Sequence, residues 1–128
     1  MKRNELTTET GMLFLDDQGI VHVTSFQGVE ETLDQAKASI AAIKAVSEDK
    51  LRPIVLDMRP IKGQKREVRD YYASPAASSA YAAAAILVGS PISRMIGNIF
   101  IGIGKLPVPT KLFSGEQEAI EWLKGYMG

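Results

Sequence analysis

Hydrophobic and polar positions along the chain follow two different periods, and the change of period separates predicted strands from predicted helices. Strand-like runs cover residues 12–14 and 20–26. The Asp-Asp-Gln-Gly segment at 16–19 is typical of a turn, so the chain is predicted to open with a β-hairpin. In the second run, Ile20, His22 and Thr24 face one side of the sheet, and the residues between them face the other.

Apolar residues three or four positions apart predict four helices. The first covers residues 30–46, with acidic residues near its positive N-terminal end, and the second covers residues 64–73. Ser90 and Pro91 begin the third helix as an N-cap hydroxyl and a first-turn proline. Ser114 and Gln117 match a capping box that begins the last one. The predicted core stripe of the third helix comprises Ile92, Met95, Ile96, Ile99 and Ile103.

Short apolar runs between these helices predict further strands at residues 54–56, 86–88 and 110–113. The runs at 54–56 and 86–88 are uninterrupted, which is typical of strands buried on both faces. The resulting element order is ββαβαβαβα. Strands that alternate with helices predict a single-domain α/β fold with a mainly parallel sheet, an antiparallel N-terminal strand and flanking helices.

The length of 128 residues suits one domain, which we place at residues 11–128. Residues 1–10 are polar and lack the apolar run of a secretory signal, so we expect a disordered or frayed lead-in. The most apolar stretch, residues 82–104, is broken by polar residues, glycine and proline, so no transmembrane segment is expected. These features predict a soluble, cytoplasmic protein.

Composition narrows the chemistry. Lys plus Arg and Asp plus Glu each total 15, and a net charge of zero argues against nucleic-acid binding. The chain has no cysteine, and its one histidine, His22, excludes multi-histidine metal sites. His22 and Asp57 are the remaining ingredients for acid–base work, without a recognisable nucleophile. We therefore expect neither an enzyme nor a cofactor or metal site.

A basic segment follows the strand at 54–56. Ligands of open α/β sheets bind beyond the carboxyl ends of strands, where helix N-termini favour anions. This segment is therefore a candidate site for an anionic ligand or an acidic partner, and a solvated surface is the alternative. Tyr72, next to Tyr71 on the second helix, is expected to line a crevice beside it. The basic residues are Arg59, Lys62, Lys65, Arg66 and Arg69.

Residues 99–103 are too apolar for a single helix face. Phe100 and Ile101 point away from the predicted core stripe, and with Ile103 they form a candidate interface with a protein partner or a second copy. The alternative is that the connector containing Pro107 and Pro109, or the N-terminal segment, covers this end of the helix.

Three motifs carry a resemblance to a known family. Residues 53–57, Pro-Ile-Val-Leu-Asp, resemble a central strand that ends in an aspartate, and residues 86–91, Ile-Leu-Val-Gly-Ser-Pro, resemble the fourth strand with the following helix start. Leu112-Phe113 followed by residues 118–123, Glu-Ala-Ile-Glu-Trp-Leu, resembles an ending common in bacterial proteins of this type. Residues 11–128 thus resemble the STAS domain family of anti-sigma-factor antagonists (SpoIIAA-like). The resemblance implies that fold and a non-enzymatic regulatory or interaction module.

One departure from this family concerns regulation. In antagonists of the phospho-switch type, a serine or threonine directly follows the aspartate, and its phosphate breaks a protein interface. Here Met58 follows Asp57, and no serine or threonine occurs before Ser74, so the switch is expected to be absent. The alternative function is binding of an anionic metabolite or a lipid-like amphiphile, in a pocket near Phe100 and Tyr72 with Arg59 or Lys62 at its charged end.

Overall fold

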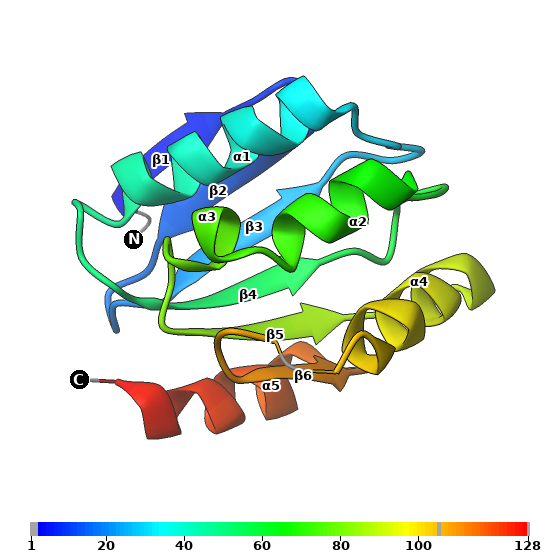
Figure 1. Cartoon of the computed structure of the whole chain (residues 1–128). Helices are drawn as coiled ribbons and strands as arrows, with labels where there is room; N and C mark the ends of the chain where they lie inside the picture. Colours follow the sequence, from blue (N-terminus) through cyan, green and yellow to red (C-terminus); the bar gives the residue numbers. More distant parts are fainter. Residues whose placement is uncertain (1–2, 105, 128) are drawn as a thin grey trace.

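A computed structural model describes residues 3–104 and 106–127 and shows a six-stranded sheet in the order β1-β2-β3-β4-β5-β6 (Figure 1). The first three strands pair antiparallel, and β3 to β6 pair parallel. The predicted α/β class and mainly parallel sheet are confirmed. The strands are β1 (Arg3–Thr7), β2 (Gly11–Leu15), β3 (Val21–Ser25), β4 (Pro53–Asp57), β5 (Ala83–Leu87) and β6 (Thr110–Phe113). The helices are α1 (Leu33–Val46), α2 (Arg66–Tyr72), α3 (Pro75–Ser78), α4 (Pro91–Gly102), α5 (Glu116–Leu123) and the 3₁₀ turn η1 (Lys124–Tyr126).

The helices divide between the two faces of the sheet. Helices α1 to α4 cover one face, and α5 covers the other (Figure 1). Val21 and Val23 pack beneath α1, whereas Ile20 packs with Leu123 of α5. The predicted alternation of side chains along β3 is therefore confirmed. No helix among the described residues is long and apolar enough to cross a membrane.

Local sequence signals explain where the helices begin. The Thr32 hydroxyl accepts a hydrogen bond from the backbone of Gln35, whose side chain accepts one from the Thr32 backbone, so a capping box precedes α1. Ser90 caps α4 as predicted. By contrast, Gly115 rather than Ser114 precedes α5, and the Ser114 hydroxyl accepts a hydrogen bond from Arg94 at 3.3 Å. The predicted capping box at Ser114 is therefore wrong.

The N-terminal segment differs from expectation. Residues 3–7, expected to be part of a frayed lead-in, form β1 and pair with β2 through Leu6 opposite Leu13 and Thr7 opposite Met12. The reason is that the outer edge of β2 offers unpaired backbone groups, which a polar segment can satisfy without burying its side chains. Residues 1 and 2 of the expected lead-in lie outside the described residues.

The rotation of α4 also differs from the predicted core stripe. Ser93, Ile96, Gly97 and Phe100 are buried, and Phe100 is only 8% exposed. A side chain added at Gly97 would stand 3.0 Å from Val88 and 3.1 Å from Leu112, closer than ordinary van der Waals contact, so a glycine suits this close approach of the helix to the sheet. Four large apolar residues of the predicted stripe consequently face outward. This α4 stripe comprises Ile92, Met95, Ile99 and Ile103.

An aromatic cluster lies on the face covered by α5. Trp122 packs against Phe113 and Tyr126, with ring centroids 5.7 Å and 4.9 Å apart. Both Phe113 and Trp122 contact the buried residues that join α5 to β5. Trp122 therefore packs its helix against the sheet.

Candidate functional site

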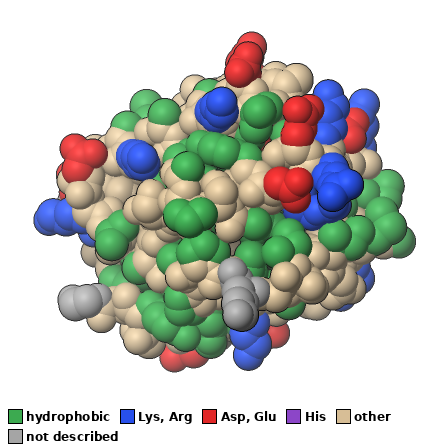
Figure 2. All heavy atoms as spheres, in the orientation of Figure 1, with side chains coloured by type: hydrophobic (Ala, Val, Ile, Leu, Met, Phe, Trp, Pro, Cys, Tyr) green, Lys and Arg blue, Asp and Glu red, His purple; other side chains and the backbone are tan. Residues whose placement is uncertain are grey.

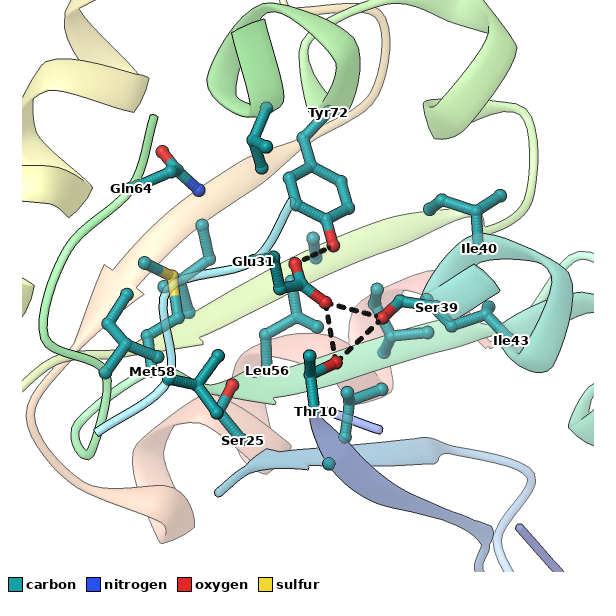
Figure 3. Close-up of a pocket in the computed structure, with 18 of the residues that line it drawn as sticks. Thr10, Ser25, Glu31, Ser39, Ile40, Ile43, Leu56, Met58, Gln64 and Tyr72 are labelled. Carbon is teal, nitrogen blue, oxygen red and sulfur yellow. Dashed lines mark hydrogen bonds between the residues drawn. The ribbon is translucent and has the colours of Figure 1, made fainter. Parts of the chain in front are cut away.

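A cavity of about 100 Å³ lies between the sheet and the helices α1 and α2 (Figure 3). Its lining includes Ser25 at the end of β3 and Met58 just after β4, so it lies at the carboxyl ends of these strands, the place that open α/β sheets favour for ligands. Most of its walls are apolar, with contributions from every layer around it. The apolar residues include Leu13, Ile40, Ile43, Leu56, Val68 and Phe100.

A carboxylate is the centre of the polar part of the cavity. Glu31 Oε2 accepts hydrogen bonds from Thr10 Oγ1 at 2.8 Å and from Ser39 Oγ at 2.7 Å, and Glu31 Oε1 accepts one from the Tyr72 hydroxyl (Figure 3). These hydroxyls come from the loop before β2, from α1 and from α2. The network therefore joins three separate segments around one half-buried charge.

Tyr72 is held in its neutral form. Burial, together with the negative charge of Glu31, raises the pKa of the Tyr72 phenol well above its usual value. Tyr81, which also lines the cavity, has a pKa raised to about 12 by burial. Tyr72 therefore remains a hydrogen-bond donor to Glu31 throughout the physiological pH range.

Two loops that line the cavity are joined by backbone hydrogen bonds. The backbone N–H of Gly28 donates to the carbonyl of Pro60, and that of Lys62 donates to the carbonyl of Val29, each at 2.9 Å. Gln64 follows this pairing and lies at the far side of the cavity from Ser39 (Figure 3). Its carbonyl oxygen is buried without a hydrogen-bond partner among the described residues.

The basic segment is not part of this cavity. Tyr72 lines the cavity as expected, but the described lining contains no lysine or arginine. Arg66 is exposed and lies 3.8 Å from Asp70 on its own helix. The expected arrangement with Arg59 or Lys62 at the charged end is therefore wrong for this cavity, because its charged group is Glu31. Lys65 and Arg69 likewise lie outside the cavity.

Arg59 is engaged elsewhere. Its guanidinium donates to both carboxylate oxygens of Asp57, at 2.9 Å and 2.7 Å, and its backbone N–H donates at 3.1 Å. Burial opposes ionisation of Asp57, but the hydrogen bonds from Arg59 outweigh it and lower the pKa of that carboxyl. Met58 directly follows Asp57, where antagonists of the phospho-switch type carry a serine or threonine. It is half-buried and lines the cavity.

His22 lies on the opposite face of the sheet. Its ring stacks on Phe14 with centroids 4.4 Å apart, and its two nitrogens lie 2.8 Å from Asp16 Oδ2 and 3.5 Å from Glu116 Oε1. Among the described residues, no nucleophilic side chain bonds to His22, and no group of three or more acidic or histidine side chains could hold a metal ion. The ring is therefore held between two carboxylates.

The predicted interface residues separate in the structure. Phe100 is buried and lines the cavity, Ile101 is half-buried, and Ile103 is exposed. Phe100 was therefore wrongly assigned to an outer surface, because the apolar residues of α4 allow two phases and Gly97 selects the other one. Figure 2 shows hydrophobic side chains gathered at the edge of the molecule where α4 lies.

Most of the polar cavity residues were not predicted from the sequence. Glu31 was expected only as one of the acidic residues near the N-terminal end of the first helix. The capping box formed by Thr32 and Gln35 was the available signal, since it places Glu31 before the helix and free to turn inward. No local pattern marks Thr10 or Ser39, whose partner lies 21 or 8 residues away.

Comparisons with solved structures identify the fold. An anti-sigma factor antagonist from Mycobacterium paratuberculosis superposes with a TM-score of 0.64 at 18% identity, covering 93% of this chain and 99% of that chain. A DUF3478 protein with a SpoIIAA-like fold from Shewanella loihica PV-4 gives a TM-score of 0.55 at 8% identity, covering 96% and 95%. The predicted STAS-like fold is confirmed.

A further solved structure, a protein with unknown function from Arthrobacter sp. FB24, is 31% identical over 93% of this chain and 96% of that chain, with a TM-score of 0.36. No curated protein matches. A family model matches residues 13–127, nearly the whole of the domain. The chain belongs to the family described as a domain of unknown function, DUF7793.

Proposed function

We propose that this domain is a non-enzymatic binding module of the bacterial cytoplasm whose ligand is a small, largely apolar molecule held in the cavity beneath α1 and α2. The cavity itself is the observation that carries the proposal. Its walls are apolar and its few polar groups converge on one carboxylate, which is the usual composition of a small-molecule site. An apolar cavity of about 150 Å³ binds benzene, and the space here is about 100 Å³, so it suits a short alkyl group or one ring that lies partly outside it.

The cost of maintaining the cavity supports a binding role. Interiors are close-packed, and an unfilled apolar space forfeits contacts that a ligand can supply. A half-buried carboxylate is also costly unless it is hydrogen-bonded, and three hydroxyls have to converge on Glu31 to satisfy it. Larger apolar residues at these positions would fill the space at less cost, so the arrangement favours an occupant.

The same geometry argues against catalysis in the cavity. The three hydroxyls that reach Glu31 act as donors to it, and Tyr72 is held neutral by its raised pKa. Met58 supplies no hydroxyl where a phospho-switch would carry one, so we propose that occupancy of the cavity, rather than phosphorylation at this position, changes the state of the domain.

The cavity proposal is tested by titrating the protein with toluene and recording ¹H–¹⁵N correlation spectra at each concentration. We expect saturable shifts at residues of the cavity wall such as Ile43 and Leu56. Ser25→Leu places an apolar group in the cavity and should abolish the shifts, whereas Thr24→Leu, the next residue on the exposed opposite side of the strand, should preserve them. Absence of saturable shifts in the unmodified chain would refute the proposal.

Self-association is a second candidate function, and the α4 stripe is the observation that favours it. Four large apolar side chains on one helix face exceed the scattered exposure usual on a monomer surface. If the stripe joins two copies, Ile99→Lys should convert a dimer into a monomer in size-exclusion chromatography with light scattering. Asn98→Lys adds the same charge at an exposed neighbour and should leave the mass unchanged. Equal masses for both variants would exclude this interface.

A further inference from the structure

The cavity holds a single charged group among its described lining residues, the carboxylate of Glu31. The cations of the loop that lines the cavity after β4 lie outside the cavity. Arg59 is paired with Asp57, and Lys62 is exposed. A ligand that enters therefore meets a fixed negative charge with no compensating positive charge in the cavity wall.

The hydroxyls around Glu31 are already used. Thr10, Ser39 and Tyr72 each donate their hydrogen to the carboxylate. An ionised carboxylate has about four lone-pair positions, so three donors leave about one to be filled. The immediate surroundings of Glu31 therefore offer an acceptor to the ligand rather than donors.

Gln64, on the far side of the cavity from Ser39, carries no charge, and its amide contains both an acceptor and a donor group. Glu31 therefore decides which charge the cavity accepts.

Building on the proposed function, we propose that the occupant is a small apolar molecule ending in an amine or hydroxyl group that donates to Glu31, and that carboxylates and phosphates are excluded. An anionic group at this position would face an ionised carboxylate in surroundings of low dielectric, where like charges repel strongly. The inference reverses the sequence-based expectation of an anionic ligand.

Three ligands of nearly equal size test the proposal at pH 7: benzylamine, benzyl alcohol and benzoate, which are cationic, neutral and anionic. Dissociation constants are measured from shifts of the cavity resonances, with toluene as the probe of the cavity itself. We expect benzoate to bind at least about tenfold more weakly than the other two ligands. Benzoate binding as tightly as benzylamine would overturn the proposal.

The variant Glu31→Gln tests whether the charge of Glu31 causes the preference for benzylamine over benzoate. It keeps the size of the side chain, and hydroxyls can rotate to accept from the new amide. We expect the preference for benzylamine over benzoate to collapse while toluene binding is retained. Glu30→Gln removes the same charge at an exposed neighbour outside the cavity and should keep the preference. If Glu31→Gln does not fold, the three-ligand comparison on the unmodified chain still decides the question.

The outcomes separate this inference from the function on which it rests. If toluene and all three ligands fail to bind, the cavity is not a ligand site and both proposals fall. If toluene binds and the three ligands bind equally well, the proposed function stands and the ligand class is wrong.

Discussion

Glu31 ties together segments that are far apart in the chain. Its partners lie 21, 8 and 41 residues away, in the loop before β2, in α1 and in α2. Because a carboxylate in these surroundings depends on its donors, the loss of one donor should lower the free energy of unfolding even in the absence of ligand.

Tyr72→Phe removes one of these donors and little else. We expect the free energy of unfolding, measured by urea denaturation, to fall by about 2 kcal/mol because a hydrogen bond to a charged group is lost. Tyr71→Phe is the matched control, since its half-buried neighbouring ring has no hydroxyl contact to Glu31, and it should cost less than about 0.5 kcal/mol. Equal costs for the two variants would contradict the role given to the network.

The pair formed by Asp57 and Arg59 predicts a pH dependence. The pKa of Asp57 is lowered in the folded state, so at acidic pH the unfolded chain binds more protons than the folded one. The stabilisation is fully present above the unfolded pKa, near 3.8, and is lost as pH falls through the lower folded value. Asp57→Asn should therefore flatten the fall in stability between neutral and strongly acidic pH in urea titrations.

Asp70→Asn is the control for this measurement. Asp70 is exposed and stands 3.8 Å from Arg66, a distance at which a solvated pair contributes little. The pH profile of this variant should follow that of the unmodified chain. A profile flattened equally by both substitutions would show that Asp57 has no special role.

At the scale of elements, the apolar periodicity of α4 predicts a helix but does not determine which face of it is buried. Apolar residues occupy nearly all sides of this helix, so two stripes fit the sequence, and the expected one was wrong. The deciding information is volume rather than hydrophobicity. Gly97 lies on the buried side because a side chain there would press against Val88 and against Leu112 of β6. Ser93 is buried there because its hydroxyl accepts hydrogen bonds from the backbone N–H groups of Gly89 and Ser90.

Two adjacent substitutions check this phase. Phe100→Ala should lower the free energy of unfolding by about 3–5 kcal/mol, since it empties a site that is buried against the sheet. Ile99 is 42% exposed, and Ile99→Ala should cost less than about 1 kcal/mol. Chemical denaturation of both variants measures the difference, and a reversed order would restore the phase expected from the sequence.

The cavity residues mark where sequence-based prediction of the site ends. The location beyond the carboxyl ends of the strands and the part played by Tyr72 could be predicted, because strand order and helix periodicity are local signals. The convergence of Thr10, Ser39 and Glu31 could not be predicted, because it depends on how three elements pack together. The basic segment also follows the carboxyl end of a strand, but its charged side chains do not line the cavity.

At the scale of the whole molecule, the order of strands and helices followed from the sequence apart from β1. The alternating run at β3 and the uninterrupted apolar runs at β4 and β5 gave a clear signal, whereas the polar residues of β1 gave none. An edge strand needs only backbone pairing with its neighbour, so its side chains follow no apolar pattern. The short helix α3 was also not predicted, because it lies in a stretch of alanine and serine without apolar periodicity.

Removal of residues 1–7 tests the importance of this edge. The deletion leaves the backbone of β2 unpaired along one side, and an uncovered edge is prone to pair with other chains. We expect a lower urea midpoint and a mass in light scattering that rises with protein concentration. An unchanged midpoint together with a concentration-independent mass would mean that β1 contributes nothing to the sheet.

The aromatic cluster places the tryptophan fluorophore on one face of the sheet and leaves the cavity, with its tyrosines, on the other face. Trp122, the chain's one tryptophan, packs with Phe113 and Tyr126 beneath α5, on the face of the sheet opposite the cavity. The residues that could respond to an occupant directly are the tyrosines Tyr72 and Tyr81. Tryptophan emission should therefore stay constant while the cavity fills and change when α5 detaches, so a constant emission spectrum during a titration says nothing against binding.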